Sequence, residues 1–287
     1  MLRIALPNKG RLSEEALALF ETAGLKANFS SSRALMADMG QGYDAIFVRA
    51  ADIPEFVADG AADVGVTGHD LVIETGRDVE ELIDLGFGRC RLAVAVPENL
   101  GISSVSELPA GTRIATSFPG VATRFFESKG VDIEIAEMSG AVEIAPHLGM
   151  ADAIVDLVST GSTLKVNRLV EIETIVESTA RVIANRGALA DDDRGRMIER
   201  LSTALQSVLR ARAKRYLMAN VPRAKLDEVR KVVPGMNGPT IVDVLDADAW
   251  VAVHVVVDEE RVFDTISELK ELGAEGILVS RIERITP

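Results

Sequence analysis

The sequence predicts an α/β protein: two lobes of mostly parallel sheet covered by helices, followed by a smaller domain. From residue 2 to residue 158, short apolar strands alternate with helical segments of about ten residues, which is typical of parallel sheets with helices on both faces. The alternation runs as two successive sets, so it predicts two lobes with a cleft between them. The last stretch of roughly 70 residues reads β-α-β-β-α-β, the order of a ferredoxin-like domain.

The first set of elements starts with an apolar strand at 2–6 and a helix at 13–25, for which Ser13 is the expected N-cap and Gly24 marks the end. The same alternation then predicts a strand at 43–50, a helix at 52–60, a strand at 62–70 and a helix that begins near Leu71.

The second set is predicted from apolar strand-like runs at 91–97, 112–117, 131–138 and 152–158, and from helical runs at 122–130 and 141–149. Residues 168–186 are rich in β-branched residues and are predicted to carry the chain back to the first lobe. A spacer or packing helix follows, with an acidic first turn and an apolar stripe at Met197, Ile198, Leu201, Leu205, Val208 and Leu209.

The terminal domain is predicted to contain strands at 215–221, 239–245, 250–258 and 274–285, with helices at 224–233 and 260–273. We therefore expect three parts. The first lobe takes residues 1–90 with 178–212, the second lobe takes 91–177, and the ferredoxin-like domain takes 213–287.

Composition excludes some classes of function. With 31 Lys and Arg against 44 Asp and Glu, the net charge of −13 argues against a nucleic-acid-binding protein. The single cysteine, Cys90, fits a reducing compartment, and the three histidines are scattered without zinc spacing. Arg3, Lys9 and Arg11 are charges at positions too early to leave room for the apolar region of a signal peptide. No uncharged apolar run of about 18 residues follows. We therefore expect a cytoplasmic protein with no membrane segment.

The segment "ADAIVDLVSTGSTL" at 151–164 carries the strongest chemical signal. A strand delivers Asp156 to its carboxyl end and runs into a turn that is rich in hydroxyls: Ser159, Thr160, Gly161, Ser162 and Thr163. Such a turn places backbone N–H groups and hydroxyls around a point where an anion can bind, and an ionised Asp156 suits the hydroxyls of a sugar. The alternative is an ordinary capped helix start. The strand-end position in an α/β lobe favours the phosphate site.

The stretch "EIAPHLGMADAIVDLVSTGSTL" resembles the phosphoribosyl pyrophosphate (PRPP) loop of ATP phosphoribosyltransferases. The segments "LRIALPNKGRL", "VRAADIPEFVADGAADVGVTGHDLV" and "LGFGRCRLAVAVP" are similar to that family as well, and the likeness spans the whole chain. The resemblance implies a two-lobed catalytic body of the type II periplasmic-binding-protein-like fold. It also implies a C-terminal ferredoxin-like (ACT-like) regulatory domain, the mark of the long, histidine-regulated form.

The resemblance also implies roles for individual residues. Asp156 and Glu143 would bind the ribose hydroxyls of PRPP, and the turn from Ser159 to Thr163 would hold the 5-phosphate. Positive charge for the pyrophosphate would come from Lys9, Arg11 and Arg49, of which Arg49 follows the apolar run "AIFV".

On the nucleotide side, the resemblance implies that ATP meets Arg11, Asp70 and Leu71. Two alternatives come from the residues themselves. Lys9 and Arg11 suit a solvated loop equally well, and Asp70 suits the cap of the next helix.

The implied reaction attaches N1 of the adenine of ATP to C1 of the ribose of PRPP and releases pyrophosphate, the first step of histidine biosynthesis. Mg²⁺ is expected as the cofactor, bound through the pyrophosphate, because this ion binds phosphates with only one or two carboxylates.

The family likeness also implies dimers that assemble to a hexamer, and feedback inhibition by L-histidine between copies of the terminal domain. The matching positions are Asn220, Met236, Gly238, Thr240 and Ala274. This sequence departs from relatives that have an acid at the position of Asn220 or a longer loop before Pro222. The alternative is that the domain only joins subunits.

Two other functions fit parts of the pattern. Prephenate dehydratase also couples a two-lobed α/β body to a ferredoxin-like tail, and "ATRFF" at 122–126 is similar to its Thr-Arg-Phe signature. That assignment leaves "DLVSTGST" and "PNKGRL" unexplained. A solute-binding receptor would explain "ADVGVTGHD", but such receptors usually carry an export signal or a lipid anchor.

Overall fold

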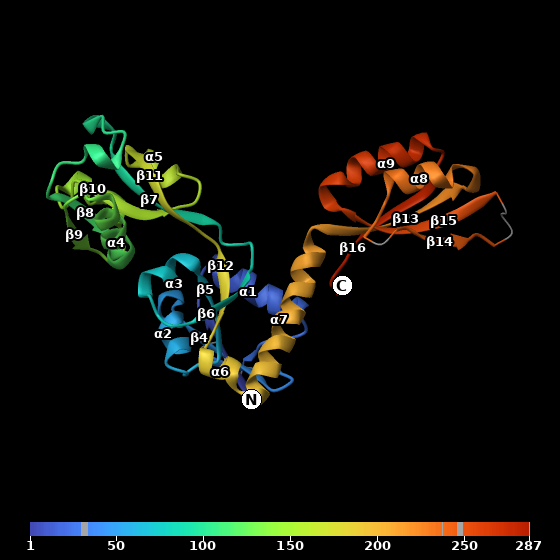
Figure 1. Ribbon diagram of the computed structural model, residues 1–287, viewed down its shortest axis with the longest axis horizontal. Coiled ribbons are helices and arrows are strands. Elements are labelled where there is room, and N and C mark those ends of the chain that lie inside the picture. Colours follow the sequence, from blue (N-terminus) through green and yellow to red (C-terminus); the bar gives the residue numbers. More distant parts are fainter. Residues whose placement is uncertain (30–33, 237, 246–248, 287) are drawn as a thin grey trace. The chain divides into compact units, whose positions relative to one another are not determined.

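The computed structural model describes residues 1–29, 34–236, 238–245 and 249–286 (Figure 1). The chain forms two compact units. The first comprises Met1–Glu21 and Leu25–Arg200, and the second comprises Thr22–Gly24 and the chain from Leu201 onward. The first unit contains two sheets and the second contains one.

The first sheet has seven strands in the order β2-β3-β4-β1-β5-β12-β6. Its strands β4, β1 and β5 are parallel, so their carboxyl ends lie at one edge of the sheet. Strand β12 joins β5 and β6 in antiparallel fashion. The strand bounds are Asn28–Phe29 (β2), Met36–Gly40 (β3), Tyr43–Val48 (β4), Leu2–Pro7 (β1), Val64–Gly68 (β5), Ala180–Ala184 (β12) and Glu80–Asp84 (β6).

Three helices belong to this sheet: α1 (Arg11–Thr22), α2 (Ile53–Ala58) and α3 (His69–Thr75). Helix α2 packs tightly on β5. A Cβ atom placed on Gly65 would lie 2.5 Å from Cγ2 of Ile53 and 2.9 Å from Cγ2 of Val57. The close approach of strand and helix therefore requires glycine at this position.

The second sheet has five strands in the order β11-β7-β10-β8-β9. Strand β10 is parallel to β8 and antiparallel to β7, so the sheet is mixed. The strand bounds are Leu169–Ser178 (β11), Cys90–Pro97 (β7), Ala153–Val158 (β10), Thr112–Thr116 (β8) and Ile133–Glu137 (β9). Helices α4 (Pro119–Lys129) and α5 (Ser162–Val166) follow β8 and β10, and Phe126 of α4 is fully buried in the core of this lobe.

The chain returns to the first sheet as the β-branched stretch predicts. Strand β11 pairs with β7 of the second sheet, and after Thr179 strand β12 pairs with β5 of the first sheet. The helices α6 (Arg186–Ala190) and α7 (Asp192–Arg212) come next.

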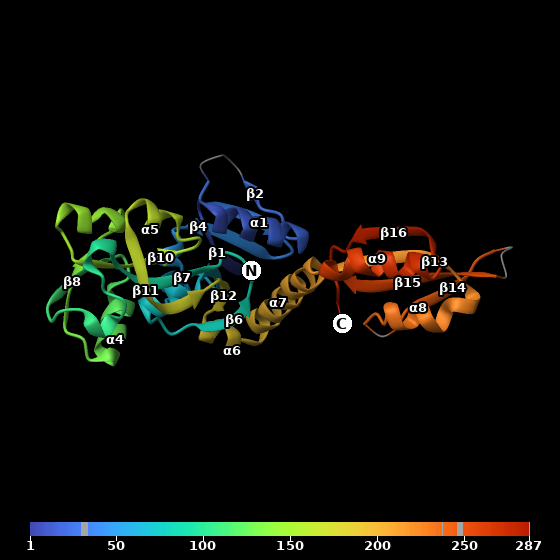
Figure 2. The ribbon, with the colours of Figure 1, turned by 90° about the horizontal axis from the view of Figure 1, so that it is seen from above.

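The C-terminal sheet has the order β14-β15-β13-β16, and its paired strands are antiparallel. This is the strand order of a ferredoxin-like domain, as predicted. Helices α8 and α9 cover one face, against the alternate valines of β15 (Figure 2). The bounds are Lys214–Pro222 (β13), Leu226–Val232 (α8), Thr240–Asp243 (β14), Trp250–Asp258 (β15), Val262–Glu271 (α9) and Glu275–Arg281 (β16).

The predicted helix at 141–149 is wrong. The segment forms two short 3-10 helices, η4 (Val142–Ile144) and η5 (Pro146–Leu148). Pro146 lacks an N–H group and its ring clashes with the preceding turn, so an α-helix cannot run through it. Ala141 has a φ of +55°, which also lies outside the helical region.

The predicted cap at Ser13 is also wrong. Helix α1 begins at Arg11, and the N–H groups of Ser13 and Glu14 donate to the carbonyl oxygen of Gly10.

Strands β2, β3 and β6 were not predicted. Strands β2 and β6 lie at the edges of the sheet, and the sequences "MADMG" of β3 and "EELID" of β6 carry acids and few β-branched residues. Within the described residues, no helix is long and apolar enough to cross a membrane.

Replacing the glycine between β5 and α2 tests this packing. We expect Gly65→Ala to lower the melting temperature by several degrees, because forcing a methyl group into a packed interior destabilises a protein by about 1–3 kcal/mol. The control is Gly140→Ala, where the added Cβ would meet no atom within 4 Å. Differential scanning calorimetry that finds equal melting temperatures for the two variants would contradict the account.

Candidate functional site

The turn after β10 depends on a glycine. The chain leaves the strand at Val158 and reaches Gly161, which has a φ of +77° and precedes the first residue of α5. A Cβ atom at Gly161 would meet nothing within 4 Å, so glycine is needed for the backbone conformation and not for space. The turn therefore has a defined shape and an open outer side.

Hydroxyl groups cover that outer side. Ser159, Thr160, Ser162 and Thr163 are exposed, and the hydroxyls of Thr160 and Ser162 lie 3.0 Å apart. Hydroxyl and exposed backbone N–H groups are the neutral donors that proteins use to bind phosphate oxygens. The turn is therefore suited to an anion.

Two carboxylates lie beside the turn. Asp156 is half-buried, and its Oδ1 accepts the N–H of Leu157 at 2.8 Å. Burial raises the pKa of Asp156, and the negative charge of Glu143 raises it further. Glu143 stands on η4, two residues after Ala141, whose left-handed backbone is strained for a residue with a side chain.

One open cavity of about 460 Å³ joins these groups. Its lining contains most of the predicted site: Arg11, Glu143, Asp156, Ser159, Thr160, Gly161, Ser162 and Thr163. Arg11 comes from the first residue of α1 in the first lobe, whereas the others come from the second lobe. Its guanidinium is highly exposed and lies 3.8 Å from Glu15, so it is available to a ligand.

Lys9 and Arg49 do not line this cavity. They follow neighbouring parallel strands, because Pro7 of β1 pairs with Val48 of β4 and the N–H of Asn8 donates to the carbonyl oxygen of Val48. Both side chains are exposed, and neither forms an ion pair with another residue in the part of the chain that the structure describes. The two cations therefore lie at the edge of the first sheet from which Arg11 also starts.

Asp70 and Leu71 have structural partners. The carboxylate of Asp70 is buried and accepts the hydroxyl of Ser178 at 2.5 Å, while the backbone N–H of Asp70 donates to the same hydroxyl oxygen. Burial raises the pKa of Asp70, and the bond from Ser178 opposes that shift. Leu71 packs on the hydrophobic core of the second lobe. Neither side chain lines the cavity of the turn.

The described residues contain no group of three or more His, Cys, Asp or Glu side chains that could hold a metal ion. The cavity does offer the pair Glu143 and Asp156. Two carboxylates fit Mg²⁺ when phosphate oxygens complete its coordination, since this ion rarely uses an all-protein site.

A second candidate site lies on the C-terminal domain. Met236, Gly238 and Thr240 of the predicted effector site line a cavity of about 240 Å³ together with Tyr216 and His254. The hydroxyl of Tyr216 lies 2.7 Å from Nδ1 of His254. The sequence analysis assigned no binding role to these two residues. The sequence feature that could have indicated them is the alternation of side chains along the two strands, which places Tyr216 and His254 on the face of the sheet opposite the buried valines.

The other two effector positions lie elsewhere. Asn220 pairs with Glu275 at the start of edge strand β16, and Ala274 just before it is buried in the domain core. Thr240 lies on the opposite edge strand, β14. One copy of the domain therefore does not bring all five positions together.

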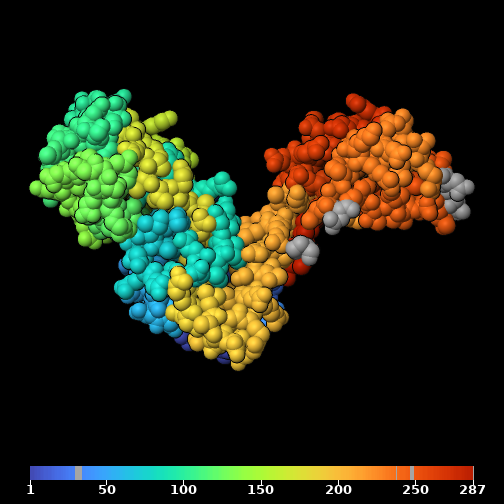
Figure 3. Space-filling model, viewed as in Figure 1, coloured from blue at the N-terminus to red at the C-terminus, as the bar shows by residue number. Residues whose placement is uncertain are grey.

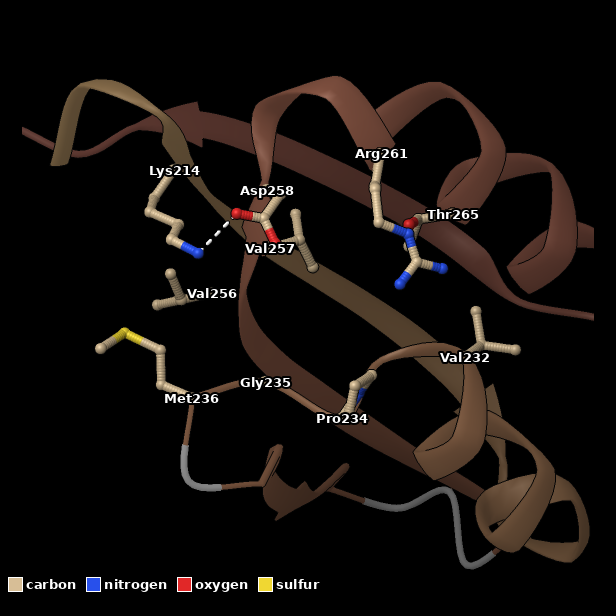
Figure 4. Close-up of a pocket in the computed structure, with 10 residues that line it drawn as sticks. All are labelled: Lys214, Val232, Pro234, Gly235, Met236, Val256, Val257, Asp258, Arg261 and Thr265. Atoms are coloured by element: carbon tan, nitrogen blue, oxygen red, sulfur yellow. Dashed lines mark hydrogen bonds and ion pairs between the residues drawn. The ribbon is translucent and has the colours of Figure 1, made fainter. Parts of the chain in front are cut away.

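A smaller cavity of about 150 Å³ lies beside Met236 (Figure 4). Lys214 and Asp258 line it and form an ion pair at 2.5 Å, and Arg261 reaches toward it from the segment before α9. Met236 thus lines two cavities of the C-terminal domain.

Comparison with known proteins identifies relatives over the whole chain. The family model "HisG: ATP phosphoribosyltransferase" matches residues 49–207, and "HisG, C-terminal domain" matches residues 211–284. An ATP phosphoribosyltransferase of Gemmatimonas aurantiaca is 56% identical, with 100% of each chain covered. One of Methanocaldococcus jannaschii is 47% identical and covers 99% of this chain and 100% of its own.

Solved structures agree on the fold. The ATP phosphoribosyl transferase (HisG:HisZ) complex from Thermotoga maritima matches with a TM-score of 0.63 and 31% identity, covering 72% of this chain and 99% of that one. The protein Tv2483 bound to L-arginine matches with a TM-score of 0.50 and 13% identity, covering 71% and 83%, and shows the fold alone. The predicted class, a type II periplasmic-binding-protein-like body with a ferredoxin-like domain, is confirmed.

The half-buried acid before the turn, Asp156, should affect stability. A carboxyl whose pKa is raised on folding binds its proton more tightly in the folded state, so it destabilises the protein increasingly as pH rises from the unfolded pKa of about 3.9 through the folded pKa. We therefore expect Asp156→Asn to have an equal or higher melting temperature than the parent at pH 7, with the difference disappearing toward pH 4. Calorimetric scans across this pH range test the prediction. A lower melting temperature for Asp156→Asn than for the parent at pH 7 would contradict a raised pKa of Asp156.

Proposed function

This chain belongs to the ATP phosphoribosyltransferase family, and on that premise we propose that the cavity beside Asp156 is the site that binds PRPP. The enzyme is a pentosyltransferase of histidine biosynthesis. It joins C1 of the ribose of PRPP to N1 of the adenine of ATP and releases pyrophosphate. The observation that carries the proposed site is a single cavity that unites two carboxylates, four hydroxyls and one arginine.

The proposed orientation of PRPP follows from the chemistry of the cavity wall. The 5-phosphate lies against the turn from Ser159 to Thr163, whose hydroxyl and N–H groups donate to its oxygens. The ribose hydroxyls donate to Asp156 and Glu143, which accept best when ionised. The ribose is then held between the phosphate turn and η4.

Cations of the first lobe are proposed to receive the other end of PRPP and the nucleotide. Arg11 enters the cavity, and Lys9 and Arg49 follow neighbouring strand ends of the same sheet. As the bond from C1 to pyrophosphate breaks, negative charge grows on the leaving group, and fixed cations stabilise it. ATP approaches from the same edge, with Arg11 as its contact. Both Asp70 and Leu71 are engaged, Asp70 through its carboxylate and its backbone N–H with Ser178 and Leu71 through core packing, so we propose that they position the start of α3 and do not contact ATP through their side chains.

The chemical step needs orientation more than acid–base chemistry. N1 of the adenine forms a bond to C1 with its own electron pair, while the electron pair of the breaking bond leaves with pyrophosphate. The transition state has the character of a glycosyl cation, so the two carboxylates near the ribose favour it electrostatically. The cavity contributes by holding both reactants in line.

We propose that PRPP binds as its Mg²⁺ complex, with the ion on the pyrophosphate group. When bound, it neutralises the charge of the leaving group. Glu143 and Asp156 are the residues of the cavity that could also hold it. Burial raises the pKa of Asp156 and the negative charge of Glu143 raises it further, and a divalent cation bound beside the two carboxylates would oppose both effects.

Substitution of the turn tests the PRPP site. We expect Asp156→Asn and Thr163→Ala each to lower kcat/KM for PRPP by roughly 10- to 100-fold, because a hydrogen bond to a charged group contributes about 1.5–3 kcal/mol. Formation of the adduct from ATP, PRPP and Mg²⁺ can be followed by its ultraviolet absorbance. The control is Thr123→Ala, an exposed position on α4. Unchanged PRPP kinetics in either turn variant would refute the assignment, and turnover of prephenate by the parent would reject the reaction itself.

For the C-terminal domain we propose an L-histidine site that is completed between two copies within a dimer or hexamer. Separation of Asn220 and Ala274 from Met236, Gly238 and Thr240 within one copy supports this arrangement. Tyr216 and His254 join the site, because they line the same cavity as Thr240. Thr240 offers a hydroxyl to the effector, whereas buried Ala274 offers only its backbone.

Removing the hydroxyl of Thr240 tests the effector site. We expect Thr240→Val to raise the histidine concentration needed for half-inhibition by about tenfold, the effect of losing one hydrogen bond of roughly 1.4 kcal/mol, with uninhibited turnover unchanged. Ser267→Ala, an exposed position on α9 of the same domain, serves as the control. Equal inhibition of the two variants would place the effector elsewhere.

A further inference from the structure

Two helices from different lobes exchange contacts at their ends. Helix α3 follows β5 of the first sheet, and α4 follows β8 of the second, and the two lie side by side (Figure 1). The carboxylate of Glu74 on α3 accepts two backbone N–H groups at the start of α4: Gly120 donates to Oε1 and Val121 donates to Oε2, both at 2.8 Å.

The exchange is reciprocal. Nη2 of Arg124, on α4, donates to the carbonyl oxygen of Ile73 near the end of α3 at 2.6 Å. The first N–H groups and last carbonyl groups of a helix have no partner within the helix. Here each helix supplies a charged side chain of the appropriate sign to the end of the other, which also matches the helix dipoles.

Packing around this contact leaves little freedom. Leu71 and Ile73 of α3 pack on the hydrophobic core of the second lobe. A Cβ atom on Gly120 would lie 3.1 Å from both the carbonyl oxygen and Oε1 of Glu74, and 3.3 Å from Nη1 of Arg124. The φ of Gly120 lies outside the left-handed region, so its backbone accepts an alanine, and the added methyl group is opposed by the contacts with Glu74 and Arg124.

The cavity of the phosphate turn depends on how the two lobes meet. Arg11 reaches it from the first lobe, and the turn itself belongs to the second. The surfaces of the two lobes are continuous in Figure 3, where the blue and cyan segments of the first lobe meet the green segments of the second. A change in the angle between the lobes therefore moves Arg11 relative to the turn.

We propose that Glu74 and Arg124 are positioning residues of the transferase. Their exchange of helix-end contacts holds the lobes in the arrangement in which Arg11 faces the phosphate turn. Neither residue touches the substrates. The inference rests on the proposed PRPP site, since that site defines which arrangement of the lobes is productive.

A positioning role has a kinetic signature of its own. When the productive arrangement is only a fraction of the population, the apparent affinity for PRPP falls by that fraction, while saturating PRPP restores the arrangement and the turnover. We expect Glu74→Ala to raise KM for PRPP, and the dissociation constant measured by calorimetry, by roughly tenfold, with kcat within about twofold of the parent. Arg124→Ala should act in the same direction.

Two further variants separate positioning from folding. Gly120→Ala adds one methyl group against Glu74 at a position where alanine favours the helix, so it should also raise KM for PRPP while α4 stays intact. Glu74→Gln keeps one acceptor oxygen and should recover part of the affinity. The matched control is Glu127→Ala, an exposed acid on α4 without a described side-chain partner.

The outcomes are distinct. A higher KM at constant kcat in Glu74→Ala and Gly120→Ala, with recovery in Glu74→Gln, supports the proposal. An unchanged KM in both variants overturns it, and so does a loss of kcat at constant KM, which would indicate only a smaller folded fraction. If the parent binds no PRPP in the same calorimetric titration, the proposed PRPP site fails, and that result is separate from any difference among the variants.

Discussion

The half-buried carboxylate of Asp156, beside that of Glu143, is the constraint on which the site depends. Burial raises the pKa of Asp156 and the charge of Glu143 raises it further, and the fold keeps the carboxylate of Asp156 there although its neutralisation would stabilise the protein. Strand β10 makes this possible, because it lies between β7 and β8 in the sheet and its residues Val155 and Val158 are buried. A ligand that brings hydroxyl donors, and a cation with its phosphates, opposes both effects. The carboxylate of Asp156 therefore lowers stability when no ligand is bound and favours binding of the ligand.

The topology then determines what can meet at this point. At one edge of the first sheet, parallel strand β4 leads to Arg49 and its neighbour β1 leads to Lys9 and Arg11, while β10 leads to the phosphate turn of the second lobe. The chain crosses between the sheets before β7 and again at Thr179, where Ser178 binds the buried carboxylate of Asp70. The helix-end contacts of Glu74 and Arg124 add a third connection. If the cavity binds PRPP as proposed, these three connections couple substrate binding to the arrangement of the lobes.

The sequence predicted features whose cause is local. Alternating strands and helices, the βαββαβ order of the terminal domain and the turn around Gly161 all follow from patterns within about ten residues. Prediction from the sequence failed where a feature depends on contacts between residues far apart in the chain, or where one residue overrides the local pattern. Glu74 meets α4 about 46 residues along the chain, and Ser178 meets Asp70 across 108, so neither pairing leaves a local pattern. Pro146 ended a helix that the apolar spacing favoured. Tyr216 and His254 join only when β13 and β15 pair.

The most direct test of the central claim is a crystal structure of the protein with PRPP and Mg²⁺. The account predicts that the 5-phosphate lies within hydrogen-bonding distance of the turn from Ser159 to Thr163, with the ribose hydroxyls on Asp156. A 5-phosphate bound at another place, with the turn free of ligand at saturating PRPP, would contradict it.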